Sequence, residues 1–225
     1  MKAIIVGDKA KIILPLVKKY GFSIVEKKPD FIVSYGGDGT LMISEYMYPG
    51  VPKIILKGSL ICKKASPFPN EEVLKRVKAG KYEIEKAWKL EANANGKKLL
   101  GLNDIVVHNS NTRHAMRYTV SVDGAAIGGG IIGDGVVVAT PFGSTGYYRS
   151  ITDSSFEVGM GLAFNNSTEQ ADHIVLNEER RLLITVTRGP STVYADNQED
   201  SIVLQTGDMV AINKSKQYAK IVRPK

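Results

Sequence analysis

The stretch Phe31-Ile32-Val33-Ser34-Tyr35-Gly36-Gly37-Asp38-Gly39-Thr40 decides how the rest of the chain is interpreted. Its first four residues are apolar or small and follow Pro29-Asp30, which predicts a short buried strand. The glycines that follow permit positive φ angles and let a ligand approach main-chain N–H groups closely. Residues 41–46 favour a helix, so we expect the loop to lead into a helix N-terminus, where phosphate binds readily.

Asp38 lies among these glycines and is not explained by anion binding, because a carboxylate repels phosphate. We expect it to hold a metal ion or to accept a proton from a hydroxyl nucleophile. A tight surface turn is the alternative, since Gly and Asp are both common turn residues. The spacing alone leaves both interpretations open.

The composition is that of a globular protein with an anionic partner. The chain has 225 residues, 43% hydrophobic and 24% charged, enough for one large domain or two small ones. No run approaches the ~20 apolar residues of a membrane span, and residues 1–8 indicate a first strand rather than a signal peptide. Cys62 is the only cysteine, which excludes an intrachain disulfide and leads us to expect a cytoplasmic protein.

The net charge of +7 fits a phosphorylated small molecule as partner. The basic run Lys63-Lys64 is short, and no recognition-helix, zinc-finger or RNA-stacking signature accompanies it, so nucleic acid and membranes are not expected partners. Residues 128–133 match G-x-G-x-x-G formally, but no helix pattern follows them, which argues against a dinucleotide fingerprint. The few histidines are dispersed, so no metal-ligating residues are assigned.

Residues 1–80 alternate strand and helix patterns, which predicts an α/β N-terminal domain with a parallel sheet. Strands are expected at 2–7, 23–25, 31–34 and 53–56, and helices at 11–20, 41–46 and 70–79. In such a sheet, ligands bind at the carboxyl ends of the strands, where the Gly36–Thr40 loop would lie.

Residues 81–225 predict an all-β C-terminal domain with turns at Gly and Asn. Asn95-Gly96 is a strong hairpin signal between 82–94 and 97–102. Further strands are expected at 104–108, 118–123, 125–132, 136–139, 181–187, 192–195, 201–204 and 209–213. The last ~15 residues can return to the first domain, since they follow the final strand pattern.

A second candidate loop lies in this domain. Gly133-Asp134-Gly135 precedes an apolar run that leads into Thr140-Pro141-Phe142-Gly143-Ser144-Thr145-Gly146-Tyr147-Tyr148. A strand that opens into such a turn presents N–H groups and hydroxyls together, which suits a nucleotide. The alternative is a helix capped by Ser144 or Thr145, with Gly146 present for packing.

Taken together and in this order, Gly36–Thr40, Asn103-Asp104, Gly133-Asp134-Gly135 and Thr140–Tyr147 resemble the motifs of the NAD kinase family. The resemblance implies that the enzyme phosphorylates the 2′-hydroxyl of the adenosine ribose of NAD to give NADP. It also implies ATP or inorganic polyphosphate as donor, Mg²⁺ as cofactor, a two-domain architecture and a homodimer or homotetramer. Asp196-Asn197-Gln198 and Gly207-Asp208 are similar to late segments of the family.

The resemblance implies a role for each matching residue. Asp38 would lie beside the 2′-hydroxyl as its proton acceptor or orienting partner. The phosphate loop would consist of Gly36, Gly37, Gly39 and Thr40. Asn103 would bind the adenosine, Asp104 the ribose hydroxyls and Asp134 the adenine amino group. The remaining candidates line the adenosine pocket or match further binding positions: Thr145, Gly146, Tyr147, Ser150, His114 and Gln198.

The chain departs from the family most in residues 52–64, which lack the usual Asn and most of the glycines. Lys57, Lys63 and Lys64 either supply phosphate-binding charge there or form a solvated basic face. Two alternatives therefore stand beside an NAD kinase: a dinucleotide-binding relative without catalysis, and a lipid kinase of the diacylglycerol or sphingosine type. Carboxylates directed at ribose and adenine describe a nucleoside site, which favours NAD over a lipid.

Overall fold

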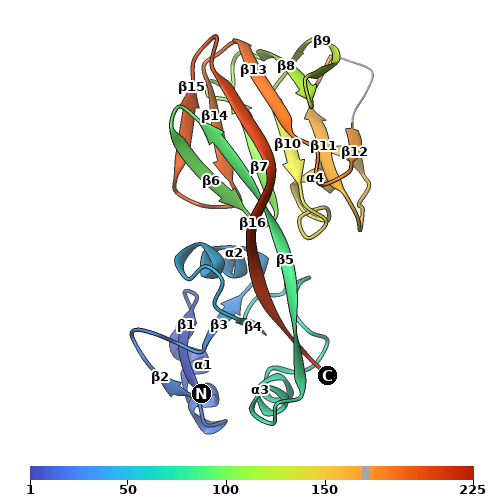
Figure 1. Cartoon of the computed structure of the whole chain (residues 1–225). Coiled ribbons are helices and arrows are strands. Elements are labelled where there is room, and N and C mark those ends of the chain that lie inside the picture. Colours follow the sequence, from blue (N-terminus) through green and yellow to red (C-terminus); the bar gives the residue numbers. More distant parts are fainter. Residues whose placement is uncertain (169–172) are drawn as a thin grey trace. The chain divides into compact units, whose positions relative to one another are not determined.

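The computed structural model describes residues 1–168 and 173–225, which form two compact units. Unit 1 comprises Met1–Ala87 and Gln217–Lys225, and unit 2 comprises Trp88–Lys216. Strands β5 (Tyr82–Ala94) and β16 (Met209–Pro224) contribute residues to both units (Figure 1). No helix in the described part of the chain is long and apolar enough to cross a membrane.

Unit 1 is built on parallel strands in the order β2-β1-β3-β4-β16. Its elements are β1 (Lys2–Val6), α1 (Ala10–Lys19), β2 (Ser23–Ile24), β3 (Phe31–Gly36), α2 (Asp38–Met47), β4 (Lys53–Lys57) and α3 (Asn70–Lys78). The alternation of strands and helices produces this arrangement, because parallel neighbours need a crossover connection. The α/β prediction for the N-terminal part is confirmed.

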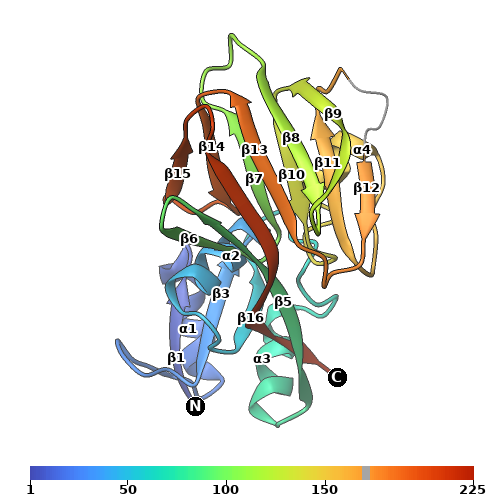
Figure 2. The same cartoon turned by 45° about the horizontal axis from the view of Figure 1, so that its top comes forward.

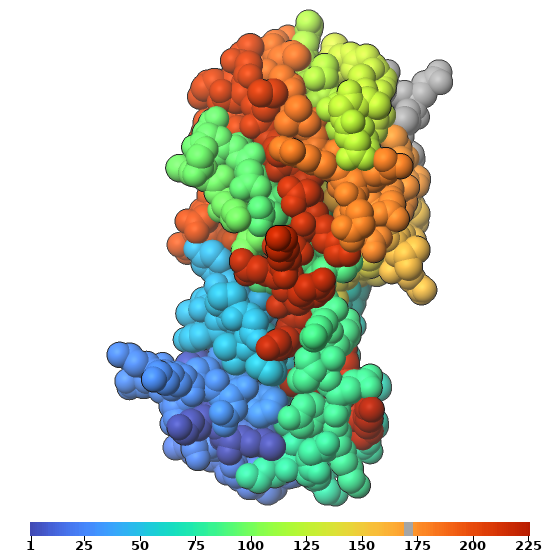
Figure 3. Space-filling view, viewed as in Figure 1, coloured from blue at the N-terminus to red at the C-terminus, as the bar shows by residue number. Residues whose placement is uncertain are grey.

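The core of unit 1 combines α1 and α3 with one face of the sheet. Ile13 and Val17 of α1 recur at helical spacing, and both are buried. They share one apolar cluster with α3 and with alternate strand residues: Val73, Leu74, Val77, Phe31, Val33, Ile54 and Leu56. The end of the chain lies at the surface of this unit beside β5, where the Lys225 ammonium is 3.0 Å from the Glu83 carboxylate (Figure 3).

A buried ion pair joins α2 to β4. Glu45 is 2% exposed and Lys53 is fully buried; the Lys53 ammonium contacts the Glu45 carboxylate and donates a hydrogen bond of 2.7 Å to the Tyr48 carbonyl oxygen.

Replacing Glu45 by Gln leaves the Lys53 charge buried without its counter-charge. We expect the free energy of unfolding of unit 1 to fall by about 3–5 kcal/mol, as measured by urea denaturation. Glu71→Gln removes the exposed partner of Lys19 and should cost less than about 1 kcal/mol. Equal losses in both variants would contradict this account.

Unit 2 consists of two antiparallel sheets, seen in Figure 2 as two layers. One sheet has the order β12-β11-β10-β7-β14-β15, and the other contains β16-β13-β8-β9 with the β5–β6 hairpin. Their remaining elements are β6 (Lys97–Gly101), β7 (Asp104–Asn109), β8 (Met116–Val122), β9 (Ala125–Gly133), β10 (Gly135–Ala139), α4 (Tyr147–Thr152), β11 (Met160–Asn165), β12 (His173–Leu176), β13 (Leu182–Arg188), β14 (Ser191–Ala195) and β15 (Ser201–Leu204).

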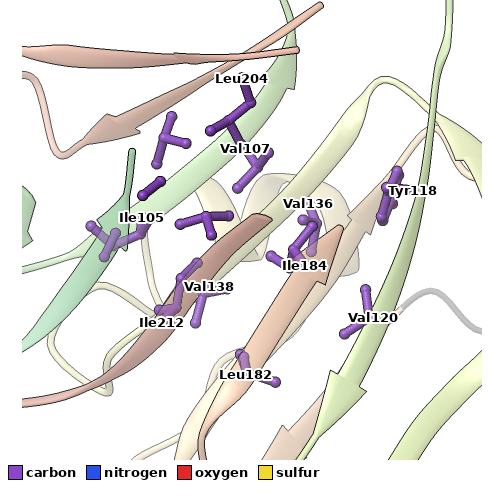
Figure 4. Packing of buried hydrophobic residues seen from close by; sticks show 14 of the residues in the cluster. Ile105, Val107, Tyr118, Val120, Val136, Val138, Leu182, Ile184, Leu204 and Ile212 are labelled. Atoms are coloured by element: carbon purple, nitrogen blue, oxygen red, sulfur yellow. The ribbon is translucent and has the colours of Figure 1, made fainter. Parts of the chain in front are cut away.

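The core of unit 2 lies between these two sheets (Figure 4). Alternate residues of β7 and β10 point into it, because side chains of a strand alternate between its faces. They pack against residues of the other sheet. Figure 4 labels Ile105, Val107, Val136, Val138 and Leu204 of the first sheet and Tyr118, Val120, Leu182, Ile184 and Ile212 of the second. The Tyr118 hydroxyl donates to the Gly135 carbonyl oxygen at 2.9 Å, which satisfies a polar group inside this apolar layer.

The structure refines several sequence expectations in unit 2. The all-β prediction is confirmed, and Asn95-Gly96 forms the β5–β6 turn with φ angles of 49° and 70°. Strands β11 and β12 were not predicted, and β16 continues well beyond the expected residue 213. Helix α4 has Gly146 as N-cap and no side-chain cap, so the expected cap by Ser144 or Thr145 is wrong. The Ser144 hydroxyl donates instead to the carbonyl oxygens of Pro141 and Phe156.

Candidate functional site

The glycine motif lies at the carboxyl edge of the unit 1 sheet. Strands β1, β3 and β4 are parallel neighbours, so the segments that follow them meet at one edge. These segments line a cavity of 770 Å³. Its lining residues are Asp8, Lys9, Tyr35, Gly36, Gly37, Thr40, Lys57, Gly58, Ser59, Leu60 and Ile61. Two lysines beside loop glycines make this cavity suitable for a polyanionic ligand.

Close packing explains why the loop needs glycine. A Cβ atom at Gly36 would overlap the Thr40 hydroxyl. Gly37 is the N-cap of α2, and the Thr40 amide donates to the Gly37 carbonyl oxygen at 3.1 Å. The helix thus starts at Asp38, earlier than predicted, and Asp38, Gly39 and Thr40 form its first turn. The positive end of the helix dipole stabilises a carboxylate there.

The segment after β4 holds the Asp38 carboxylate. The amides of Lys63 and Lys64 donate to its two oxygens at 3.3 and 2.9 Å. Burial and the neighbouring Asp38 charge raise the pKa of the Cys62 thiol, so Cys62 stays protonated at neutral pH. Burial lowers the pKa of Lys64, although the Asp38 charge opposes that shift. Residues 62–64 therefore surround Asp38 and fix its orientation.

Lys57 and Lys64 of this segment have different surroundings. Lys57 is exposed and lines the cavity, and Asn70 holds its backbone through hydrogen bonds of 2.8 and 2.9 Å. Lys64 is half-buried, and its carbonyl oxygen accepts a 2.6 Å hydrogen bond from Arg223, which in turn contacts Glu85 at 2.5 Å. Lys57 and Lys63 are exposed, as expected of a solvated basic face, whereas the position of Lys57 at the cavity suits phosphate binding, so both sequence-based alternatives stay predictions.

In unit 2, three segments meet at one end of strands β14, β7 and β10. The register pairs Ala139 with Asp104 and Ala195 with Ile105. The Thr140 amide donates to the Asn103 carbonyl oxygen at 2.8 Å, and a Cβ atom at Gly143 would overlap the same carbonyl. The Asn103-Asp104 turn is therefore fixed from both sides, which explains the need for glycine at position 143.

The side chains of Asn103 and Asp104 have properties that suit the binding of a polar ligand. Asp104 is only 6% exposed. Its pKa is raised to about 7, mainly by burial and to a smaller extent by the charge of Asp196. The side-chain Oδ1 of Asn103 is buried and has no hydrogen-bond partner among the described residues. A buried acceptor without a partner is costly, so a ligand that donates a hydrogen bond would be favoured here.

Asp134 lies at the opposite end of β10, where it precedes Gly135. Its carboxylate accepts hydrogen bonds from the side-chain amides of Asn109 at 3.2 Å and Asn166 at 2.7 Å. Asn109 also donates to the His114 carbonyl oxygen at 3.0 Å, so His114 belongs to this end, with its side chain exposed. Asp134 and His114 thus form a second polar group, separate from Asn103 and Asp104.

The phenol of Tyr147 is affected by the charges of both polar groups, through Asp104 and through Asp134. Burial, Asp104 and then Asp134 raise the pKa of its phenol, and Asn165 donates to its hydroxyl oxygen at 3.0 Å. Gly146 and Ser150 lie in or beside α4, and the Ser150 hydroxyl donates to the Tyr147 carbonyl oxygen at 2.7 Å. Thr145 is half-buried next to them.

Gln198 lies in the β14–β15 turn, and its side-chain amide donates to the Leu100 carbonyl oxygen at 2.6 Å. Sequence reasoning missed Asp8 and Lys9 of the cavity, Thr140 as an anchor, and Asp196. For Asp196 a signal existed, since it begins the Asp196-Asn197-Gln198 segment in which only Gln198 was assigned a role. Lys9 carried no such signal and is recognised only because β1 and β3 are neighbours.

Comparisons with known proteins show which family this chain is similar to. Residues 102–224 match the family model described as ATP-NAD kinase C-terminal domain. An NAD kinase of Saccharolobus solfataricus is 34% identical over 216 residues, which cover 91% of this chain and 84% of that protein. An NAD kinase of Saccharolobus islandicus is 36% identical over 140 residues, or 60% of this chain, and the match spans only 53% of the relative's length.

A solved structure shares the fold. The crystal structure of an NAD kinase from Archaeoglobus fulgidus in complex with ATP superposes with a TM-score of 0.80. The superposition covers 100% of this chain and 94% of that one at 24% sequence identity.

Proposed function

The chain belongs to the NAD kinase family, and on that premise we propose that it phosphorylates the 2′-hydroxyl of the adenosine ribose of NAD to give NADP. ATP or inorganic polyphosphate is the donor. The observation that carries the proposal is the pair of polar groups at the two ends of β10. Asp104 of β7 pairs with the last residue of β10, Asp134 precedes its first residue, and both charges raise the pKa of Tyr147. A ribose and an adenine need separate polar partners with a flat side chain nearby, and this set provides them.

The acceptor is recognised by unit 2. The Asp104 carboxylate accepts hydrogen bonds from ribose hydroxyls, the Asn103 side chain binds the adenosine, and Asp134 accepts from the adenine amino group. Asn103 supports this assignment because its buried Oδ1 has no partner among the described residues. A lipid acceptor would leave these polar groups unsatisfied.

The donor phosphates bind in the cavity of unit 1. The amides of the Gly36–Thr40 loop and the first turn of α2 hold the phosphate oxygens, and Lys9 and Lys57 neutralise their charge. Among the described residues no three acidic, His or Cys side chains form a metal cluster. Mg²⁺ commonly binds through donor phosphates and one or two carboxylates, and Asp8 is the carboxylate that lines this cavity. When bound, Mg²⁺ supplies charge neutralisation to the transferred phosphoryl group.

Asp38 acts at the reacting hydroxyl. Transfer forms a bond between the ribose 2′-oxygen and the terminal phosphorus, breaks the bond from that phosphorus to the donor oxygen, and moves the hydroxyl proton to the Asp38 carboxylate. A ribose hydroxyl is a weak nucleophile, so a positioned proton acceptor accelerates the reaction. Contacts from the Lys63 and Lys64 amides keep this carboxylate oriented before substrate arrives.

A dinucleotide-binding protein without turnover is the second candidate. It is favoured by one observation, that the altered segment 62–64 already supplies hydrogen-bond donors to both oxygens of Asp38. Incubation with NAD, Mg²⁺ and either ATP or polyphosphate distinguishes the two, because only a kinase yields NADP. We further propose a cytoplasmic homo-oligomer, a dimer or tetramer, to be measured by light scattering coupled to size exclusion.

Lys57 tests the donor side of the proposal. We expect Lys57→Gln to raise the KM for the phosphoryl donor about tenfold and to leave the KM for NAD unchanged, since one charge-assisted hydrogen bond to phosphate is lost. Steady-state kinetics with ATP and with polyphosphate measure both constants. Lys11→Gln alters an exposed lysine of α1 outside the cavity lining and serves as the matched control. An unchanged donor KM in Lys57→Gln would remove Lys57 from the donor site.

A further inference from the structure

Asp196 is a partly buried acid that the proposed chemistry does not use. It follows β14 with a positive φ of 49°, and its carboxylate contacts the turn formed by residues 102–104. One carboxylate oxygen accepts from the Leu102 amide at 2.8 Å. The other accepts from the amides of Asn103 at 2.7 Å and Asp104 at 3.1 Å. Three successive main-chain donors thus converge on one carboxylate.

These contacts join parts of the chain that are far apart in sequence. Asp196 precedes Gln198, and its own amide donates to the Asp104 carbonyl oxygen at 3.1 Å, so the two turns are linked in both directions. A local turn cap has a different pattern. Asp208, for example, accepts from one main-chain amide, that of Gln205 three residues earlier at 2.9 Å, and its single distant contact comes from the side-chain amide of Asn95 at 3.0 Å. The Asp196 contacts are therefore suited to setting the conformation of a distant turn.

Asp196 also acts on Asp104 through its charge. Burial first, and then the Asp196 charge, raises the pKa of Asp104 to about 7. Burial raises the pKa of Asp196 itself to about 6, against the lowering effects of its three amide donors and of Lys89. Tyr147 is the other titratable group coupled to Asp104, and it ionises well above neutral pH. The protonation of Asp104 near pH 7 is therefore set by burial and by Asp196.

We infer that Asp196 is a positioning residue for the acceptor nucleoside, which aligns Asn103 and Asp104 and sets the charge of Asp104 without touching the substrate itself. This inference rests on the proposed NAD site. It assigns a role to the first acid of the Asp196-Asn197-Gln198 segment. The same contacts hold the peptide groups of residues 102–104 next to the side-chain oxygen of Asn103, which has no hydrogen-bond partner among the described residues.

The test is Asp196→Asn, assayed by NAD titration calorimetry and by steady-state kinetics from pH 5.5 to 8.5. The variant keeps the volume of the side chain but loses its charge and one acceptor. We expect the Kd and KM for NAD to rise about tenfold while kcat and the donor KM stay within about twofold. The acid limb of kcat/KM for NAD should shift to lower pH by about one unit, because the like charge beside Asp104 is gone.

Two further variants keep the outcome decisive. Asp196→Glu retains the charge but displaces the acceptor, so it should weaken NAD binding without lowering the pH of the acid limb; it also serves if Asp196→Asn fails to fold. Asp208→Asn alters an acid that accepts from the Gln205 amide and the Asn95 side chain, outside the residues proposed to bind NAD, and should leave NAD binding unchanged. A folded Asp196→Asn protein with wild-type affinity and an unshifted acid limb would overturn the inference. Wild-type protein that neither binds NAD nor forms NADP would overturn the proposed function together with it.

Discussion

Replacing Asp38 by Asn is expected to lower kcat for NADP formation about 10³-fold, because the reacting hydroxyl loses its proton acceptor. The KM for NAD should change by less than about threefold, since the nucleoside contacts belong to other residues. An Asn side chain still accepts a hydrogen bond from the Lys64 amide, which lies 2.9 Å from the carboxylate. The fold should therefore be retained, and coupled detection of NADP measures the loss.

The matched control for this variant is Asp30→Asn. The Asp30 carboxylate also accepts a main-chain hydrogen bond in unit 1, from the Lys2 amide at 2.7 Å, but it lies before β3 and outside the cavity lining. Its kcat should match the wild type. If both variants lose activity equally, the loss reflects general destabilisation and Asp38 has no special role.

The second large effect concerns Asp104. We expect Asp104→Asn to raise the KM for NAD between about 10- and 100-fold at pH 8, because charge-assisted hydrogen bonds to the ribose are lost. In the wild type the KM for NAD should fall as the pH rises through about 7, where Asp104 releases its proton. The variant should show no such dependence between pH 6 and 8. Kinetics over this range measure both effects.

Stability should change in the opposite direction. Burial raises the folded-state pKa of Asp104 from 3.8 to about 7, so between these values the folded protein retains a proton that the unfolded chain has released. Stability therefore falls as the pH rises through this window. Asp104→Asn removes that loss and should increase the free energy of unfolding at pH 8 by on the order of 2 kcal/mol. A variant that is less stable at pH 8 would contradict the raised pKa.

Many helices and strands could be predicted because the turn residues and apolar patterns of short segments agree with the structure that those segments adopt. Asn95-Gly96 fixed the β5–β6 hairpin, since both residues adopt the positive φ that a tight two-residue turn requires. Strand β11 was not predicted, because Met160–Asn165 contains a glycine and no β-branched residue and therefore carries a weak strand signal. The extension of β16 was missed because its lysine-rich second half lacks a continuous apolar pattern.

The sequence motifs of the proposed site could be recognised from the sequence, but the contacts between their residues could not. The glycine motif singled out Asp38, and the resemblance to the NAD kinase motifs added Asn103, Asp104 and Asp134, whereas their hydrogen-bond partners depend on tertiary structure. The Lys64 amide that contacts Asp38 lies 26 residues away in sequence, and the Asp196 contacts span 92–94 residues. The periodic pattern of apolar residues in a sequence does not indicate such long-range contacts. Likewise, only the parallel pairing of β1, β3 and β4 revealed that Lys9 and Lys57 line one cavity.

The central claim is that this chain converts NAD to NADP. Purified protein incubated with NAD and Mg²⁺, with ATP and polyphosphate supplied separately, should form NADP that an NADP-specific dehydrogenase detects, and Asp38→Asn should abolish nearly all of it. Wild-type protein that binds NAD but forms no NADP with either donor would contradict the claim and establish a binding protein in its place.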